Sequence, residues 1–338
     1  MAHRASDRAA GPVRAASGIC IHLTIAYQIM SVEHYFHFLL GFFVPLVRYL
    51  SRGALDGGIR EILVRSCGPM DRHLRALGDP RIVILDKAAH DAARGRAASD
   101  TQRFKLIRGY DGALRYDRAV FAAVRNTMLA RADVQAEIAR ARAERGESRE
   151  RVLLIRRAPP DPFYLSDEAE VRGAGTSRRS IANHDELRRA LGERFGGVVD
   201  AELEDLALSR QIALFHLADI IVAQHGAAFA NLVWARQGTR VVEIFPRTLV
   251  AAYHPESMMR GLARCMKMHH SSVWQESDHS AVDVASVCDA VARKRPAWRQ
   301  AIEAERMRIK FLAALAGIAS APQAFAQRRA SSARAHIH

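Results

Sequence analysis

The chain has 338 residues, 49% of them hydrophobic, so it is long enough to bury a large core and to form two domains of ordinary size. Its pI of about 10.3 and its formal net charge of +14 would suit a nucleic-acid-binding protein. The basic residues are, however, scattered along the chain, without a Lys- and Arg-rich stretch interleaved with aromatic residues, so we predict no nucleic-acid partner.

The first half of the chain alternates strand-like and helix-like segments, a pattern that predicts an α/β domain. Residues 1–17 are charged and Ala-rich and are predicted to be disordered. The predicted strands are 19–27, 62–65 and 81–85, and the predicted helices are 35–48, 71–77 and 118–143. The charged stretch Glu144–Ser148 follows, and we expect it to end a first domain over 18–148.

The second half continues the alternation and predicts a second α/β domain over 149–295. The predicted strands are 152–155, 197–200, 220–223 and 240–245, and the predicted helices are one opened by Asn183, one at 206–217 and one at 228–234. Residues 296–316 have a helical pattern. We therefore expect 296–320 to pack back across the first domain and 321–338 to form a loose tail.

The cysteines and the apolar runs bear on the location of the protein. The four cysteines lie far apart with no Cys-x-x-Cys pair, which indicates a reducing compartment. No secretory signal is expected at the N-terminus, and the longest apolar run, 35–47, is too short to span a bilayer. We predict a cytoplasmic protein, whose positive charge would also suit peripheral association with the inner membrane surface.

The stretch 219–246 has the strongest functional pattern in the chain. A strand-like run is broken by His225 and Gly226, a helical run follows, and Gly238 turns the chain into a second β-branched run. Such a unit presents free helix amides beside the carboxyl end of a strand, where α/β proteins bind phosphorylated ligands. His225 and Glu243 are predicted to face that crevice.

The order of these residues resembles glycosyltransferase family 61, which contains plant xylosyltransferases, animal O-linked N-acetylglucosamine transferases and many bacterial polysaccharide-biosynthesis proteins. The family pattern is a His-Gly-Ala turn, a helical Asn, a Gly-Thr turn and a Val-Glu-(Ile/Leu)-Phe-Pro strand end. The chain matches it at His225, Gly226 and Ala227, at Asn231, at Gly238–Thr239 and at Val242–Pro246. The resemblance extends less sharply over 34–254.

The resemblance implies that His225, Gly226, Ala227, Asn231 and Glu243 contact the sugar donor. Two of these side chains would equally suit a purely structural role. His225 would fit a tight turn as a helix-capping residue, with Gly226 serving backbone geometry. Glu243 would accept hydrogen bonds from a ribose, or it would be paired with a neighbouring arginine, Arg240.

A second cluster supplies positive charge. Arg157 follows a predicted buried strand, and its planar guanidinium could bind a diphosphate through two hydrogen bonds. The family has an Ile-Ser-Arg here, whose arginine Arg157 matches, and then an Arg-x-Ile-x-Asn, which is matched by Arg179, Ile181 and Asn183. Asn183 would alternatively act only as an N-cap with Glu186 following it, and Arg179 would then merely pair with that acid.

A third cluster, Glu33-His34-Tyr35-Phe36-His37-Phe38-Leu39-Leu40, resembles the family's Asn-Tyr-Tyr-His-Trp-Leu-Leu-Asp segment. His37 matches the family's His, and Gly41 stands in place of its acid. If that acid is the family's catalytic base, this chain is impaired or uses another group, for which His37 and Glu33 are the candidates. His37 would alternatively be a buried, hydrogen-bonded histidine on an apolar helix.

No metal site is predicted. No two aspartates stand two residues apart, so the Asp-x-Asp signature of metal-dependent, single-sheet nucleotide-sugar transferases is missing, and His269 and His270 have no partners at metal-ligand spacing. Arginines and helix amides would neutralise a leaving diphosphate instead. This favours the GT-B architecture, in which two Rossmann-like domains face a cleft and the C-terminal domain holds the nucleotide.

The resemblance implies an inverting transfer of a hexose or pentose from a nucleotide sugar, predicted to be UDP-linked, to a hydroxyl of a glycan, a polysaccharide or a lipid-linked glycan. No cofactor is predicted beyond this co-substrate, and the expected setting is bacterial capsule or exopolysaccharide biosynthesis. A catalytically degenerate scaffold of the same fold is the alternative, because Gly41 replaces the family's acid. A basic nucleic-acid-binding protein ranks third.

Overall fold

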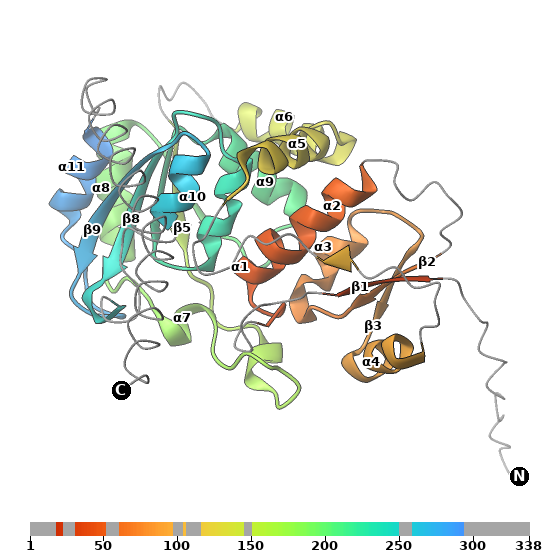
Figure 1. Ribbon diagram of the computed structural model, residues 1–338. Helices are drawn as coiled ribbons and strands as arrows, with labels where there is room; N and C mark the ends of the chain where they lie inside the picture. Colours follow the sequence, from red (N-terminus) through yellow and green to blue (C-terminus); the bar gives the residue numbers. More distant parts are fainter. Residues whose placement is uncertain are drawn as a thin grey trace, which may run out of the picture. The chain divides into compact units, whose positions relative to one another are not determined.

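The computed structural model describes residues 18–22, 31–51, 61–96, 104–105, 116–144, 151–249 and 259–293. The chain divides into two compact units, Met1–Val291 and Ala292–His338, and both sheets belong to the first (Figure 1). The segments predicted at 1–17, 296–320 and 321–338 lie outside the described residues. So does the predicted domain boundary near 148, which stays a prediction.

The first sheet has four parallel strands in the order β3-β2-β1-β4. Its strands are β1 (Gly18–His22), β2 (Glu61–Arg65), β3 (Ile82–Leu85) and β4 (Phe104–Lys105), and its flanking helices are η2 (Gly68–Met70), α3 (Asp71–Arg75) and α4 (Lys87–Arg96). Alternate residues of β2 are buried, as expected for a strand with one face on the core. The predicted strands at 62–65 and 81–85 and the helix at 71–77 are confirmed within a few residues.

The helix predicted at 35–48 forms three segments instead of one. They are α1 (Tyr35–His37), the π-helix η1 (Phe38–Phe43) and α2 (Val44–Leu50). Pro45 has no backbone N–H, so it cannot donate to the carbonyl of Gly41, and the Val44 N–H bonds instead to Leu39 O, five residues back. The proline therefore explains the widened turn.

The single helix predicted at 118–143 is also wrong. The structure has α5 (Arg118–Leu129) and α6 (Ala132–Ala143), with Arg131 in extended conformation between them. The Arg131 guanidinium donates to the carbonyls of Ala76 and Leu77 at 2.8 and 3.0 Å, at the end of α3. This tertiary contact stabilises a break that the periodicity of the sequence does not reveal.

The second sheet has five parallel strands in the order β6-β5-β7-β8-β9. The strands are β5 (Val152–Arg156), β6 (Val198–Glu202), β7 (Ile220–Gln224), β8 (Arg240–Pro246) and β9 (His269–Gln275). The connecting helices are η3 (Pro162–Leu165), α7 (Gly175–Arg178), α8 (His184–Phe195), α9 (Leu208–Leu217), η4 (Ala227–Trp234), η5 (Arg247–Leu249) and α10 (Met259–Cys265), and α11 (Val284–Ala292) follows β9. No described helix is long and apolar enough to cross a bilayer.

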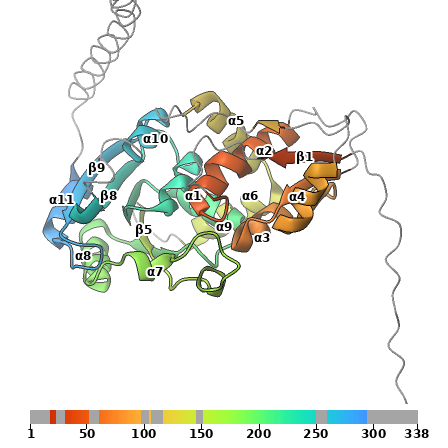
Figure 2. The same ribbon diagram turned by 60° about the horizontal axis from the view of Figure 1, so that its bottom comes forward.

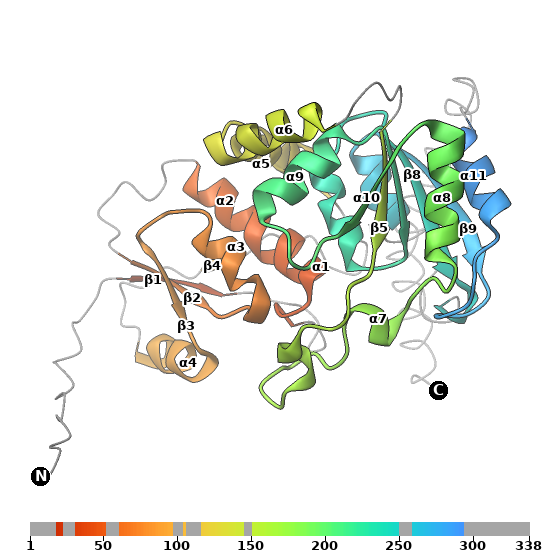
Figure 3. The same cartoon turned by 180° about the vertical axis from the view of Figure 1, so that it is seen from behind.

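Helices cover both faces of this sheet, so β7 is buried throughout and β5 is buried up to Ile155. Leu154 and Val222 point to the face packed by α8 and α11, which lie together at one side of the sheet in Figure 3. Their neighbours Leu153 and Ile221 point to the other face, where α9, η4 and α10 join a core shared with the first sheet. Because the side chains on both faces of these strands are buried, β5 and β7 are continuous apolar runs in the sequence.

The strand order places a topological switch point between β5 and β7. The chain runs from β5 outward to β6 on one side and then crosses to β7 on the other, so the two connections leave the sheet in opposite directions. In open parallel sheets, ligands bind at the carboxyl ends of the strands at such a point. The predicted α/β class with parallel sheets is confirmed, and the ligand site is expected beyond Arg156 and Gln224.

Candidate functional site

A cavity of about 660 Å³ lies at this switch point. One wall comes from the carboxyl ends of β5 and β7 and from α7, and the other comes from the segment before and through α1 and from α3. Figure 2 shows the loop between β5 and α7 passing below α1 and α3. The predicted site residues that line the cavity are Glu33, His37, Arg157, Arg179, His225, Gly226 and Ala227.

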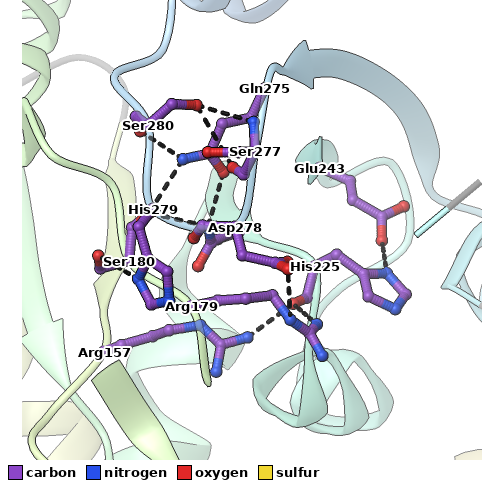
Figure 4. A network of polar contacts seen from close by, with 11 residues as sticks. Arg157, Arg179, Ser180, His225, Glu243, Gln275, Ser277, Asp278, His279 and Ser280 are labelled. Atoms are coloured by element: carbon purple, nitrogen blue, oxygen red, sulfur yellow. Dashed lines mark hydrogen bonds and ion pairs between the residues drawn. The ribbon is translucent and has the colours of Figure 1, made fainter. Parts of the chain in front are cut away.

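Two arginines converge on one backbone carbonyl at the centre of the wall (Figure 4). Arg157 Nη2 donates to His225 O at 2.6 Å, and Arg179 Nη1 donates to the same oxygen at 3.0 Å. The Asp278 carboxylate lies 3.5 Å from Arg179 Nε. Burial, followed by the charge of Arg179, lowers the pKa of Arg157 to about 10, so the Arg157 guanidinium is charged at neutral pH. This pair is suited to bind an oxyanion.

Gly226 permits the close approach of Arg157. A Cβ atom at position 226 would lie 2.1 Å from Arg157 Nη2. The φ angle of Gly226 is 166°, which any residue can adopt, so the need for glycine here comes from space and not from backbone strain. The His-Gly pair of the sequence motif therefore holds a guanidinium against the end of β7.

We expect Gly226→Ala to lower turnover by up to about 10²-fold, because the new methyl group displaces the Arg157 guanidinium and misplaced groups lose their catalytic effect. The flexible arginine can move, so the melting temperature should change little. Gly192→Ala in α8, where a Cβ meets nothing within 4 Å, is the matched control and should keep full activity. Full activity of Gly226→Ala in a steady-state assay would contradict this role.

His225 is the outer member of a buried triad. Its Nδ1 donates to Glu243 Oε1 at 2.5 Å, and His270 Nε2 donates to Glu243 Oε2 at 2.8 Å. Glu243 is 1% exposed. Burial opposes its ionisation, but the two histidine hydrogen bonds outweigh burial and lower the pKa of Glu243 below its usual value. The predicted alternative partner of Glu243, Arg240, is not its partner. The carboxylate fixes the orientation of the His225 ring at the cavity.

We expect Glu243→Gln to lower the free energy of unfolding by about 1–3 kcal/mol. The substitution removes the charged carboxylate that accepts hydrogen bonds from two buried histidines, His225 and His270. The folded-state pKa of Glu243 is depressed, so the carboxylate stabilises the wild type above its ordinary value of 4.5 and this contribution is lost as pH falls through the folded pKa. Urea unfolding between pH 6 and 3 should therefore show a gap between the two proteins that is constant above the ordinary pKa of 4.5 and narrows below it. A pH-independent gap would count against this role of the carboxylate.

The comparison with known families agrees with this geometry. The model of the family described as Glycosyltransferase 61 matches residues 35–242, more than half of the chain. The chain belongs to glycosyltransferase family 61. The matched region contains Arg157, Arg179 and His225, whereas Glu33 and Glu243 lie just outside it. No curated protein matches the chain. Membership supports glycosyltransferase activity, with a sugar donor and a glycan acceptor as substrates.

Three groups of this family 61 member that could accept a proton line the cavity near α1. Glu33 is buried, which raises its pKa, and its Oε2 accepts from Glu170 N at 2.6 Å. Burial lowers the pKa of His37 to about 4. Burial, His37 and the charges of three arginines lower the pKa of His34 to about 3, and His34 Nδ1 is buried with no hydrogen-bond partner among the residues that the structure describes. Both histidines are therefore neutral near pH 7.

Gly41, which stands where the family has an acid, is buried in η1 among apolar neighbours and does not line the cavity. The alternative that the loss of this acid impairs catalysis stays a prediction.

Three predicted donor contacts, Asn183, Asn231 and Glu243, do not line the cavity. Asn231 is fully buried; its Oδ1 lies 2.9 Å from Tyr35 Oη, and it accepts from Trp234 Nε1 at 3.1 Å. Asn183 precedes α8 without capping it through its side chain, and it exchanges hydrogen bonds with the Val282 backbone at 2.9 and 3.0 Å. Both are structural ties between elements. Glu243 likewise acts from behind His225.

The sequence reasoning missed a group of polar residues at the same edge of the sheet. Gln224 donates through Nε2 to Ser180 O at 3.0 Å and to Gln275 Oε1 at 2.6 Å, and His270 completes the Glu243 triad. Gln224 and Gln275 end β7 and β9, and parallel strands end at one edge, so their positions were a usable signal. Gln224 Nε2 also donates to Asp278 O at 3.1 Å, and Gln275 Nε2 donates to Ser280 O at 2.5 Å, beside Asp278 in Figure 4. These bonds fix the loop that carries Asp278.

In the part of the chain that the structure describes, no three His, Cys, Asp or Glu side chains are grouped to hold a metal ion. The predicted absence of a metal requirement is untouched by this finding and stays a prediction.

Proposed function

We propose that this protein is an inverting, metal-independent glycosyltransferase that transfers a sugar from a nucleotide-sugar donor, UDP-linked, to a hydroxyl of a glycan or polysaccharide. The observation that carries the proposal is the convergence of Arg157 and Arg179 on His225 O at the switch point of a parallel sheet. Two guanidiniums held side by side can donate charge-assisted hydrogen bonds to the oxygens of a diphosphate. The free amides at the start of η4 would add to the same anion site.

We assign the chain to the GT-B architecture on the basis of its two parallel sheets. The sheet that ends in the arginine pair would hold the nucleotide, and α1 and α3, on the opposite wall, would face the acceptor. The positive net charge supports a cytoplasmic enzyme with peripheral attraction to an anionic membrane. No cofactor besides the nucleotide sugar enters the proposal, and a hexose or pentose destined for bacterial polysaccharide is the expected cargo.

The proposed reaction is a single displacement. The acceptor hydroxyl oxygen forms a bond to the anomeric carbon while the bond from that carbon to the diphosphate oxygen breaks, and the hydroxyl proton passes to a base on the enzyme. The negative charge that develops on the leaving nucleoside diphosphate is stabilised by Arg157 and Arg179. His37 and Glu33 remain the proposed bases, and the geometry adds His34.

His34 would gain basicity when the donor binds. The charges of Arg178, Arg179 and Arg157 contribute to the lowered pKa of its imidazole, after burial and His37. A bound diphosphate would offset the arginine charges and so remove their part of the lowering of the pKa of His34, while burial and His37, the larger causes, would remain.

The test is release of nucleoside diphosphate from a panel of UDP-, GDP- and other nucleotide sugars, with and without EDTA, followed by the anomeric configuration of the product. We expect release from one nucleotide series, unaffected by EDTA, with inversion. Binding of a donor without release would favour the degenerate scaffold. Salt-sensitive binding to any DNA duplex with no donor binding would favour a nucleic-acid function.

A further inference from the structure

Arg72 is an unpaired charge on the acceptor-facing wall of the cavity. It lies in α3 and lines the cavity, where it is half-buried. Among the described residues its side chain has no hydrogen-bond partner and no carboxylate partner, and its Nε atom is buried without any polar contact. Leaving a partly desolvated guanidinium unpaired is unfavourable, so a site for an anion is indicated.

The remaining arginines of the cavity each have a partner or are exposed to water. Arg156 pairs with Asp200 at 2.8 Å and also with Asp185. Arg157 and Arg179 donate to His225 O, although Arg157 Nε is also buried without a hydrogen-bond partner among the described residues, and Arg178 is exposed to water. Arg72 differs from them because it is half-buried and, within the described part of the chain, no atom of its guanidinium has a partner.

Arg72 also acts on a different part of the cavity from the arginine pair. Burial lowers the pKa of His73 to about 4 and the Arg72 charge adds to this effect, and the same charge opposes the rise in pKa that burial causes in Tyr35 and Tyr164. Arg157, Arg178 and Arg179 instead influence His34. The cavity therefore has two positively charged regions, which we call poles: the Arg157–Arg179 pair and Arg72. The donor diphosphate would bind at the first of them.

We propose that Arg72 binds an oxyanion on the acceptor, either the carboxylate of an acidic sugar or a phosphate ester, while the donor diphosphate occupies the Arg157–Arg179 pair. The proposal rests on the proposed function, because it assigns the second pole to the second substrate. The planar guanidinium of Arg72 provides parallel N–H donors that match either anion. An acidic acceptor is then the preferred substrate class, and neutral sugars are poor ones.

The experiment uses the full chain saturated with inorganic pyrophosphate, which fills the donor pole. Glucuronate, glucose 1-phosphate and glucose are then titrated by calorimetry into the wild type, Arg72→Gln and the matched control Arg75→Gln, an exposed arginine of the same helix. We expect glucuronate or glucose 1-phosphate to bind, whichever carries the right anion, and glucose not to bind. Arg72→Gln should weaken this binding about 10-fold or more, and Arg75→Gln should not.

Pyrophosphate affinity separates this inference from the function on which it rests. It should fall in Arg157→Ala and be unchanged in Arg72→Gln. An equal loss in Arg72→Gln would place Arg72 in the donor site and overturn the inference. So would equal binding of both anions to Arg72→Gln and wild type, or binding of pyrophosphate without either acidic sugar. A wild type that binds no pyrophosphate would overturn the proposed function itself.

Discussion

Arg157→Ala is expected to lower turnover by about 10²–10³-fold, the usual cost of removing one group that stabilises transition-state charge. Arg157 donates to His225 O at 2.6 Å beside Arg179, so its removal halves the charge available to the leaving diphosphate. Arg179→Ala should have an effect of similar size. Arg157→Lys should recover only part of the loss, because an ammonium group cannot make two parallel hydrogen bonds.

The control for this prediction is Arg236→Ala, which removes an arginine paired with Asp219 at the opposite end of β7. It should leave kcat and donor affinity unchanged. All variants are compared by kcat, donor KM and melting temperature. Turnover of Arg157→Ala within a few-fold of the wild type, in a folded protein, would remove the arginine pair from the mechanism.

The second large effect is expected at the base. Of His34→Ala, His37→Ala and Glu33→Gln, the variant that removes the base should lose about 10²–10⁴-fold in kcat while keeping donor affinity, because proton transfer and not binding is impaired. His34 is added to the two predicted candidates because it lines the same part of the cavity. Glu33 is held by the Glu170 backbone, so its substitution should also affect stability.

Measuring kcat and the donor dissociation constant separately distinguishes the base from a residue that only binds the donor. For the base, kcat should fall with the donor dissociation constant unchanged, and the loss should shrink at high pH as the acceptor hydroxyl ionises more readily. If turnover of all three variants falls only in proportion to donor binding, none of these groups is the base.

Most strands of the second sheet could be predicted because each is an apolar run bounded by a charged or turn residue. The broken helices were missed because the prediction used only the apolar periodicity. The π-turn at Phe38–Phe43 had a signal in the sequence, because Pro45 lacks a backbone N–H. The break at Arg131 had none, because it depends on the carbonyls of Ala76 and Leu77, which lie far away in sequence.

Part of the candidate site was likewise predictable from the sequence, and part was not. Arg157 and His225 follow strands that end at one sheet edge, so their meeting was predictable from parallel topology. Asn231 was predicted as a donor contact because of its place in the motif, yet it is a core tie near Tyr35. Arg72 carries no signal in the sequence, because its significance is the lack of a partner, which only the packing reveals.

Thermal stabilisation by nucleoside diphosphates, measured for the wild type and for Arg157→Ala with and without EDTA, tests the central claim most directly. A cavity that binds a diphosphate through arginines should give a stabilising shift for one nucleoside series, insensitive to EDTA and largely lost in Arg157→Ala. No shift with any nucleotide, or a shift that EDTA abolishes, would contradict a metal-independent donor site at the arginine pair.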